Sequence, residues 1–119
     1  MKAHPALLAL EQSLQRPSST PCTWRSDRDV YISEQVAMLK KCVIDPKLVK
    51  AQATSWAQQH CNQTDDVRML IAVAREKENW LLFDQEAGTF SLAYGAENDG
   101  TPLALLGFAS DDALAEWLG

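Results

Sequence analysis

Basic residues are missing from the last 42 residues of this 119-residue chain, which contain no lysine and no arginine. Residues 78–119 carry eight acids and a formal charge of −8, whereas residues 1–77 hold all eleven basic residues against eight acids, a net charge of +3. Acidic turns and helix caps that favour solubility explain part of this pattern, but soluble surfaces usually mix both signs. A negatively charged surface repels nucleic acid and attracts a basic protein partner.

Long apolar runs are also missing. The longest ones, such as Met69–Ala74, are far shorter than the roughly 18 to 20 residues that a membrane helix needs. The start, Met1–Leu10, has a charge and an apolar stretch, but Glu11 interrupts it and no small-residue cleavage site follows. We therefore expect a cytoplasmic protein without a membrane segment, forming a single globular domain over 1–119.

Residues suited to metal binding or nucleophilic catalysis are few. Two histidines and three cysteines show no C-x-x-C or H-x-x-x-H spacing, and the odd number of cysteines prevents complete pairing of Cys22, Cys42 and Cys61. His60 precedes Cys61, and on a helix adjacent side chains point about 100° apart and do not meet. The five glycines form no phosphate-binding motif. We expect no catalytic residue, metal or cofactor, and reduced, mostly buried cysteines.

Helical periodicity and capping residues predict four helices, over 5–15, 33–43, 46–60 and 65–78. Ser33 is a possible cap of the second helix. Asp45–Pro46 predicts the start of the third, because Asp favours the cap and Pro the first helical position. Thr64 followed by two acids favours the start of the fourth. The apolar, partly β-branched run within that fourth segment leaves a buried strand as the alternative.

Trp80–Asp84 predicts a strand, a loop ending at Gly88 follows, and in Thr89–Tyr94 large apolar residues alternate with Ser91 and Ala93, which together predict a β-hairpin over 80–94. Leu103–Phe108 predicts a third strand with Pro102 at its edge. Ser110 is a possible cap of a closing helix over 111–118. We therefore expect an α+β fold in which N-terminal helices pack on a small antiparallel β-meander, followed by a closing C-terminal helix. The residues expected to be among the most buried are Trp56, Leu70, Ile71, Phe90, Leu92, Leu114 and Trp117.

The acids of the second half fall on the predicted turns and on the last helix, where they would make much of one surface negative. Tyr94, at a strand end, is the candidate for an exposed aromatic anchor. Helix capping is the alternative role for the pair Asp111–Asp112. The residues predicted to bind the partner are Asp84, Glu86, Tyr94, Glu97, Asp99, Asp111, Asp112 and Glu116.

Two segments carry a resemblance to a known class of protein. NWLLFDQEAGTFSLAYG at 79–95 and FASDDALAEWL at 108–118 together resemble small bacterial immunity proteins that neutralise polymorphic or contact-dependent growth inhibition toxins. The resemblance implies a single-domain, acidic, cytosolic protein without catalysis that covers the active site or substrate surface of a toxin nuclease. It assigns a role to no individual residue.

These observations lead to the hypothesis of a non-catalytic immunity protein that binds a cognate basic toxin domain, with no nucleic-acid or membrane partner. Two alternatives remain open. One is a small acidic secretion chaperone or adaptor, which would bind a client segment through apolar surface as a dimer. The other is a DNA-mimic inhibitor, whose acids would need the spacing of phosphates.

Overall fold

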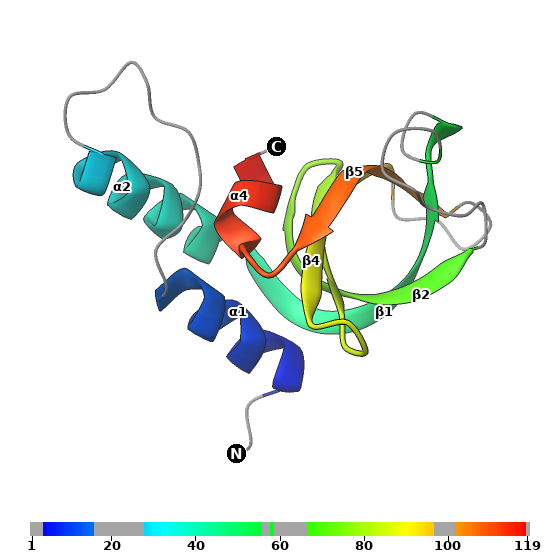
Figure 1. Ribbon diagram of the computed structural model, residues 1–119, viewed down its shortest axis with the longest axis horizontal. Coiled ribbons are helices and arrows are strands. Elements are labelled where there is room, and N and C mark those ends of the chain that lie inside the picture. The colour runs from blue at the N-terminus through cyan, green and yellow to red at the C-terminus, as the bar shows by residue number, and fades with distance from the viewer. Residues whose placement is uncertain (1–3, 16–27, 56–57, 59–66, 97–101, 119) are drawn as a thin grey trace.

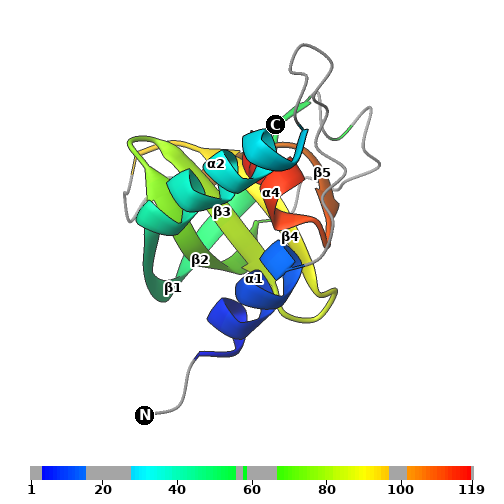
Figure 2. The same ribbon diagram turned by 90° about the vertical axis from the view of Figure 1, so that its left-hand side faces the viewer.

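The computed structural model describes residues 4–15, 28–55, 58, 67–96 and 102–118. Among these residues, three helices lie on one side of a closed five-stranded barrel (Figure 1). Figure 2, turned by 90°, shows these helices in front of the strands. The predicted α+β class, with N-terminal helices, a β-meander and a closing helix, is confirmed.

Helix α1 spans Pro5–Gln15, as predicted. The Nδ1 atom of His4 accepts a hydrogen bond from the backbone N–H of Ala6 at 3.0 Å, which satisfies a free donor of the first turn. Ala6, Leu10 and Ser13 form its buried stripe, because residues three and four apart share a helix face.

Helix α2 spans Arg28–Lys41, so the predicted range 33–43 began too late and ended too far along the chain. Ser33 lies inside the helix and is exposed, and the prediction that it caps the helix was wrong. Leu39 of this helix is buried, and Ile32 and Val36 pack against the same core.

The predicted helix over 46–60 is wrong over its first half, because Val43–Ala53 forms strand β1. The register of β1 against its neighbour shifts between Val43 and Lys47, the segment that contains Asp45–Pro46. A bulge accommodates proline within a strand because the ladder hydrogen bonds are interrupted there. Trp56 and His60 lie outside the described residues.

The predicted helix over 65–78 is also wrong, and the strand alternative is correct. Strand β2 spans Arg68–Glu76. Leu70 and Ala72 belong to the barrel interior, while Ile71 and Val73 pack beneath the helices. Burial on both faces produces a continuous apolar run, which periodicity alone cannot distinguish from a buried helix.

The predicted hairpin over 80–94 is confirmed by strands β3 (Asn79–Asp84) and β4 (Thr89–Tyr94), and the third strand by β5 (Leu103–Ser110). These three strands continue the antiparallel order from β2, and β5 then pairs with β1 in parallel. The pairing of β5 with β1 closes the sheet into a barrel, and the predicted meander is part of it. One pair must be parallel, because antiparallel pairs cannot alternate around a closed ring with an odd number of strands.

Helix α4 spans Ala113–Leu118, two residues shorter than the predicted 111–118. Asp112 is its cap: Oδ1 accepts the backbone N–H of Ala115 at 3.1 Å. Ser110 is not the cap of the helix, but its hydroxyl accepts the N–H of Asp112 at 3.2 Å. The capping alternative for the acidic pair is thus correct for Asp112.

Two apolar clusters hold the fold together. One fills the barrel interior with residues from all five strands, including the fully buried Trp80, whose Nε1 donates to the carbonyl of Gly95 at 2.8 Å. The Arg75 guanidinium lies 4.4 Å from the centre of the Trp80 rings and the Lys47 ammonium 5.4 Å from it. Both distances lie within the range of cation–π attraction.

The second cluster lies between the outer barrel face and the helices, and includes the ring pair Phe83–Phe90, with centroids 5.0 Å apart. Burial is confirmed for four of the seven residues expected in the core. Trp117 is partly buried against this cluster, and Leu92 is only partly buried. The four confirmed residues are Leu70, Ile71, Phe90 and Leu114.

Ser13 joins the first and last helices across the chain. Its hydroxyl donates to the carbonyl of Asp111 at 2.7 Å and accepts the buried N–H of Ala113 at 2.8 Å.

Among the described residues, no helix has the length and hydrophobicity needed to cross a membrane.

Candidate protein-binding surface

Asp84, at the end of β3, organises the hairpin turn that follows it. Its Oδ1 accepts the backbone N–H groups of Glu86 at 3.0 Å and Ala87 at 3.2 Å. Its Oδ2 forms an ion pair with the Arg68 guanidinium. Only 16% of the Asp84 side chain is exposed, so this carboxylate is engaged within the protein.

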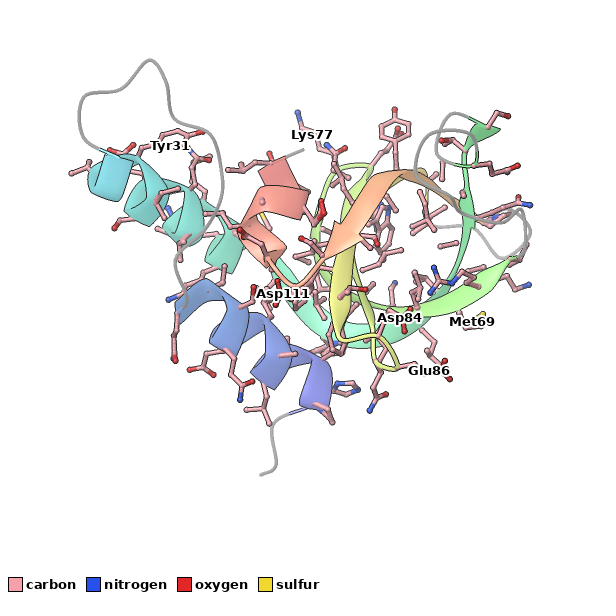
Figure 3. All side chains as sticks on the ribbon, in the orientation of Figure 1. Tyr31, Met69, Lys77, Asp84, Glu86 and Asp111 are labelled. Atoms are coloured by element: carbon pink, nitrogen blue, oxygen red, sulfur yellow. The ribbon has the colours of Figure 1, made fainter. Side chains whose placement is uncertain are left out.

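Glu86, two residues later, is exposed in the turn. Its carboxylate has no hydrogen-bond or ion-pair partner among the residues that the structure describes. Figure 3 shows Glu86 at the tip of the hairpin, next to Asp84. Glu86 is therefore a hairpin charge available to a partner.

The acids of the last helix have largely local roles. Asp112 is the cap, and Glu116 is half-buried, with its carboxylate 3.5 Å from the Ser110 hydroxyl. Burial raises the pKa of Glu116 above its ordinary value, and the nearby Asp112 charge adds to this, while the Ser110 hydrogen bond opposes it. Asp111 is exposed, at the junction of α1 with α4.

Tyr94 is exposed by 49% at the end of β4, as the sequence predicted. A hydrogen bond from its hydroxyl to Glu78, and the charge of that carboxylate, raise the pKa of Tyr94. The six residues of β4 separate Tyr94 from the 85–88 turn by roughly 20 Å, at about 3.3 Å per residue. The predicted site residues Glu97 and Asp99 lie outside the described residues.

A groove of about 360 Å³ lies beside the hairpin turn. Its most exposed apolar side chains are Leu48, on β1, at 64%, and Met69, on β2, at 53%. Ile71 pairs with both Leu48 and Phe83 in neighbouring strands, and the Ile71 and Phe83 side chains are buried. Of the predicted site residues, two line this groove, whose full lining is Leu48, Arg68, Met69, Leu70, Ile71, Phe83, Asp84, Gln85 and Glu86.

The strand register explains why these side chains share a face. Leu48 pairs with Ile71 and Lys50 pairs with Met69, and residues two apart in a strand point the same way. This outward face continues the one that the helices cover at Val73. Beyond the edge of the helices, this face meets solvent at the exposed Leu48 and Met69, with the charged Lys50 on the same face, and we name the hollow the Leu48–Met69 groove.

Neither Leu48 nor Met69 is among the residues that the sequence predicted to bind a partner. Both lay in segments predicted to be helices, where neither residue stood out from the ordinary apolar positions. Only the pairing of β1 with β2 brings them together, across 21 positions of the chain. A strand interpretation of both segments would have placed them on one face.

Metal chemistry and cysteine chemistry gain no support in the described part of the chain. It contains no group of three or more His, Cys, Asp or Glu side chains able to hold a metal ion. Cys42 is a free, partly buried thiol near Glu76, and burial followed by the Glu76 charge raises the pKa of Cys42. Cys22, His60 and Cys61 lie outside the described residues.

Comparison of the chain with protein-family models, with curated proteins and with solved structures found no match.

Proposed function

We propose that this chain is a non-catalytic immunity protein that binds and neutralises a cognate basic toxin domain, with a nuclease as the expected toxin. The observation that carries the proposal is the exposed apolar pair Leu48 and Met69 beside the acidic hairpin turn. The resemblance of segments 79–95 and 108–118 to immunity proteins points the same way.

Protein-binding surfaces combine apolar anchors, which supply affinity, with charged residues around them, which supply orientation. The Leu48–Met69 groove has the anchors, and Glu86 has a carboxylate without an internal partner. Arg68, on the same rim, is neutralised by Asp84. A cation of the partner therefore has an acceptor at the hairpin turn.

The charge of the chain supports attraction of a basic partner from a distance. The formal net charge is −5, and the sequence of β3, β4, β5 and α4 contains no lysine or arginine. Opposite charges speed diffusional encounter, and salt screens this effect over about 8 to 10 Å at physiological ionic strength. Association with the toxin should accordingly slow as salt rises.

The test is co-expression of this chain with the toxin domain encoded directly upstream of its gene, followed by binding measurements on the purified pair. Wild-type protein should restore growth and bind one to one. Glu86→Lys should slow association several-fold, whereas Glu11→Lys, an equal charge change at an exposed site on α1, should have a smaller effect. The proposal fails if the upstream gene encodes no toxin domain, or if wild-type protein neither binds that domain nor restores growth.

The secretion-chaperone alternative has one observation in its favour. A second groove, of about 290 Å³, lies between α1, α2 and the start of β1, and Leu7, Leu14 and Val43 line it. A chaperone should be a dimer with a large apolar interface, whereas the immunity function is compatible with a monomer. A dimeric mass in solution, together with binding to an unfolded client segment, would favour the chaperone.

A further inference from the structure

We propose that the Leu48–Met69 groove is the anchor site of the interface, and that it receives a large apolar side chain which the toxin presents next to a lysine or arginine. This inference deepens the proposed function and depends on it. It specifies which face of the barrel contacts the toxin and what chemistry the toxin brings to that face.

The apolar part of the site is built by three neighbouring strands. Ile71 and Phe83 form a buried floor, and Leu48 and Met69 rise beside it with more than half of their surface in water. An incoming apolar side chain would remove this surface from water without displacing any part of the protein. The gain from burial grows with the apolar area removed from water, and hot spots concentrate in such pockets.

The polar part of the site gives the groove a direction. At the hairpin end, Glu86 offers an unpaired carboxylate, while Asp84 and Arg68 satisfy each other. Lys50 pairs with Met69 on the same face and is exposed. A toxin cation is therefore favoured near Glu86 and disfavoured near Lys50, which fixes one orientation of the bound segment.

Helix α2 provides a matched control. Met38 is exposed by 54%, against 53% for Met69, so the same substitution at each position changes the same side chain at the same exposure. Met69→Asp should weaken binding to the toxin domain at least ~30-fold, which corresponds to the usual 2 kcal/mol threshold of a hot spot. Met38→Asp should stay within about twofold of wild type.

Two further variants separate binding from folding. Met69→Leu keeps an apolar side chain and should retain wild-type affinity, and the urea midpoint of each variant reports its stability. Glu86→Lys should recover part of its lost affinity when one toxin lysine or arginine is changed to glutamate, and the same toxin change should not rescue Met69→Asp.

The outcomes distinguish the two proposals. Loss of binding in Met69→Asp alone, with an unchanged urea midpoint, supports the groove. Wild-type binding and protection with equal affinities for Met69→Asp and Met38→Asp would overturn the groove and leave the immunity function standing. Failure of the wild-type protein to bind or protect would remove the proposed function, and the groove proposal with it.

Discussion

Ser13 joins α1 to the start of α4, and its removal should measurably destabilise the protein. Its hydroxyl accepts the buried N–H of Ala113 at 2.8 Å and donates to the carbonyl of Asp111 at 2.7 Å. In Ser13→Ala both bonds disappear. Water cannot easily replace the first one, because Ser13 is 94% buried, with an exposed fraction of 6%.

The expected size follows from three contributions. An unsatisfied buried N–H costs about 1–3 kcal/mol. The bond to Asp111 is only partly buried, so water can replace much of it and its loss adds little. Alanine is favoured over serine inside a helix by roughly 0.5 kcal/mol, which offsets part of the loss. Ser13→Ala should therefore lower the free energy of unfolding by about 0.5–2.5 kcal/mol.

Urea denaturation followed by tryptophan fluorescence measures this difference. With a slope of about 1–3 kcal/mol per molar urea, the midpoint should fall by roughly 1 M. Ser33→Ala is the matched control, because Ser33 is an exposed serine inside α2 and its replacement should be neutral or slightly stabilising. Equal midpoints for the two variants would refute the stabilising role of the Ser13 bridge.

Three further predictions concern stability. Burial raises the pKa of Glu116 above its ordinary 4.5. Ionised Glu116 therefore destabilises the folded protein at pH values above the raised pKa, and this destabilisation fades as pH falls towards 4.5. Glu116→Gln should raise the urea midpoint at pH 7 and raise it less at pH 4. Gly95 and Gly88 both have positive φ, 147° and 70°, which disfavours alanine at either position. Gly95→Ala should lower the urea midpoint more than Gly88→Ala, because a Cβ at Gly95 would lie 3.1 Å from the Leu103 side chain and a Cβ at Gly88 would meet nothing within 4 Å. Asp84→Ala should cost about 1–2 kcal/mol in urea denaturation, whereas Glu86→Ala should cost almost nothing, since only Asp84 is bonded to the turn.

The second half of the fold could be predicted from sequence, and the middle could not. The hairpin was predictable because β4 alternates in sequence and the short turn before it contains Gly88, two signals that need no knowledge of the rest of the chain. Asp45–Pro46 combines two residues that favour a helix start, and only the bulge of β1 shows why they lie in a strand. In β2, apolar residues face both the barrel interior and the helices, which removes the alternation that identifies a strand.

The candidate site was predictable only in its charged part. Glu86 follows a recognisable strand and lies in the hairpin turn as predicted, whereas Asp84 is the last residue of that strand, next to the turn. The internal partner of Asp84 could not be foreseen, because Arg68 belongs to a segment predicted to be helical. Leu48 and Met69 escaped notice for the same reason, since their proximity depends on strand pairing.

The parallel contact between β1 and β5 has a consequence for how the barrel forms and opens. It involves only Ala51–Ala53 against Leu103–Leu105, whereas β3 and β4 pair along their full length across a short turn. Joining segments about 50 positions apart in the sequence loses more chain entropy than closing a hairpin. The β1–β5 contact, the seam of the barrel, should therefore form late in folding and open first. Its transient opening would admit water to the barrel interior while the core beneath the helices stays packed. Amide hydrogen exchange at Thr54, which donates to the Leu105 carbonyl across the seam, should thus be faster than exchange at Leu81.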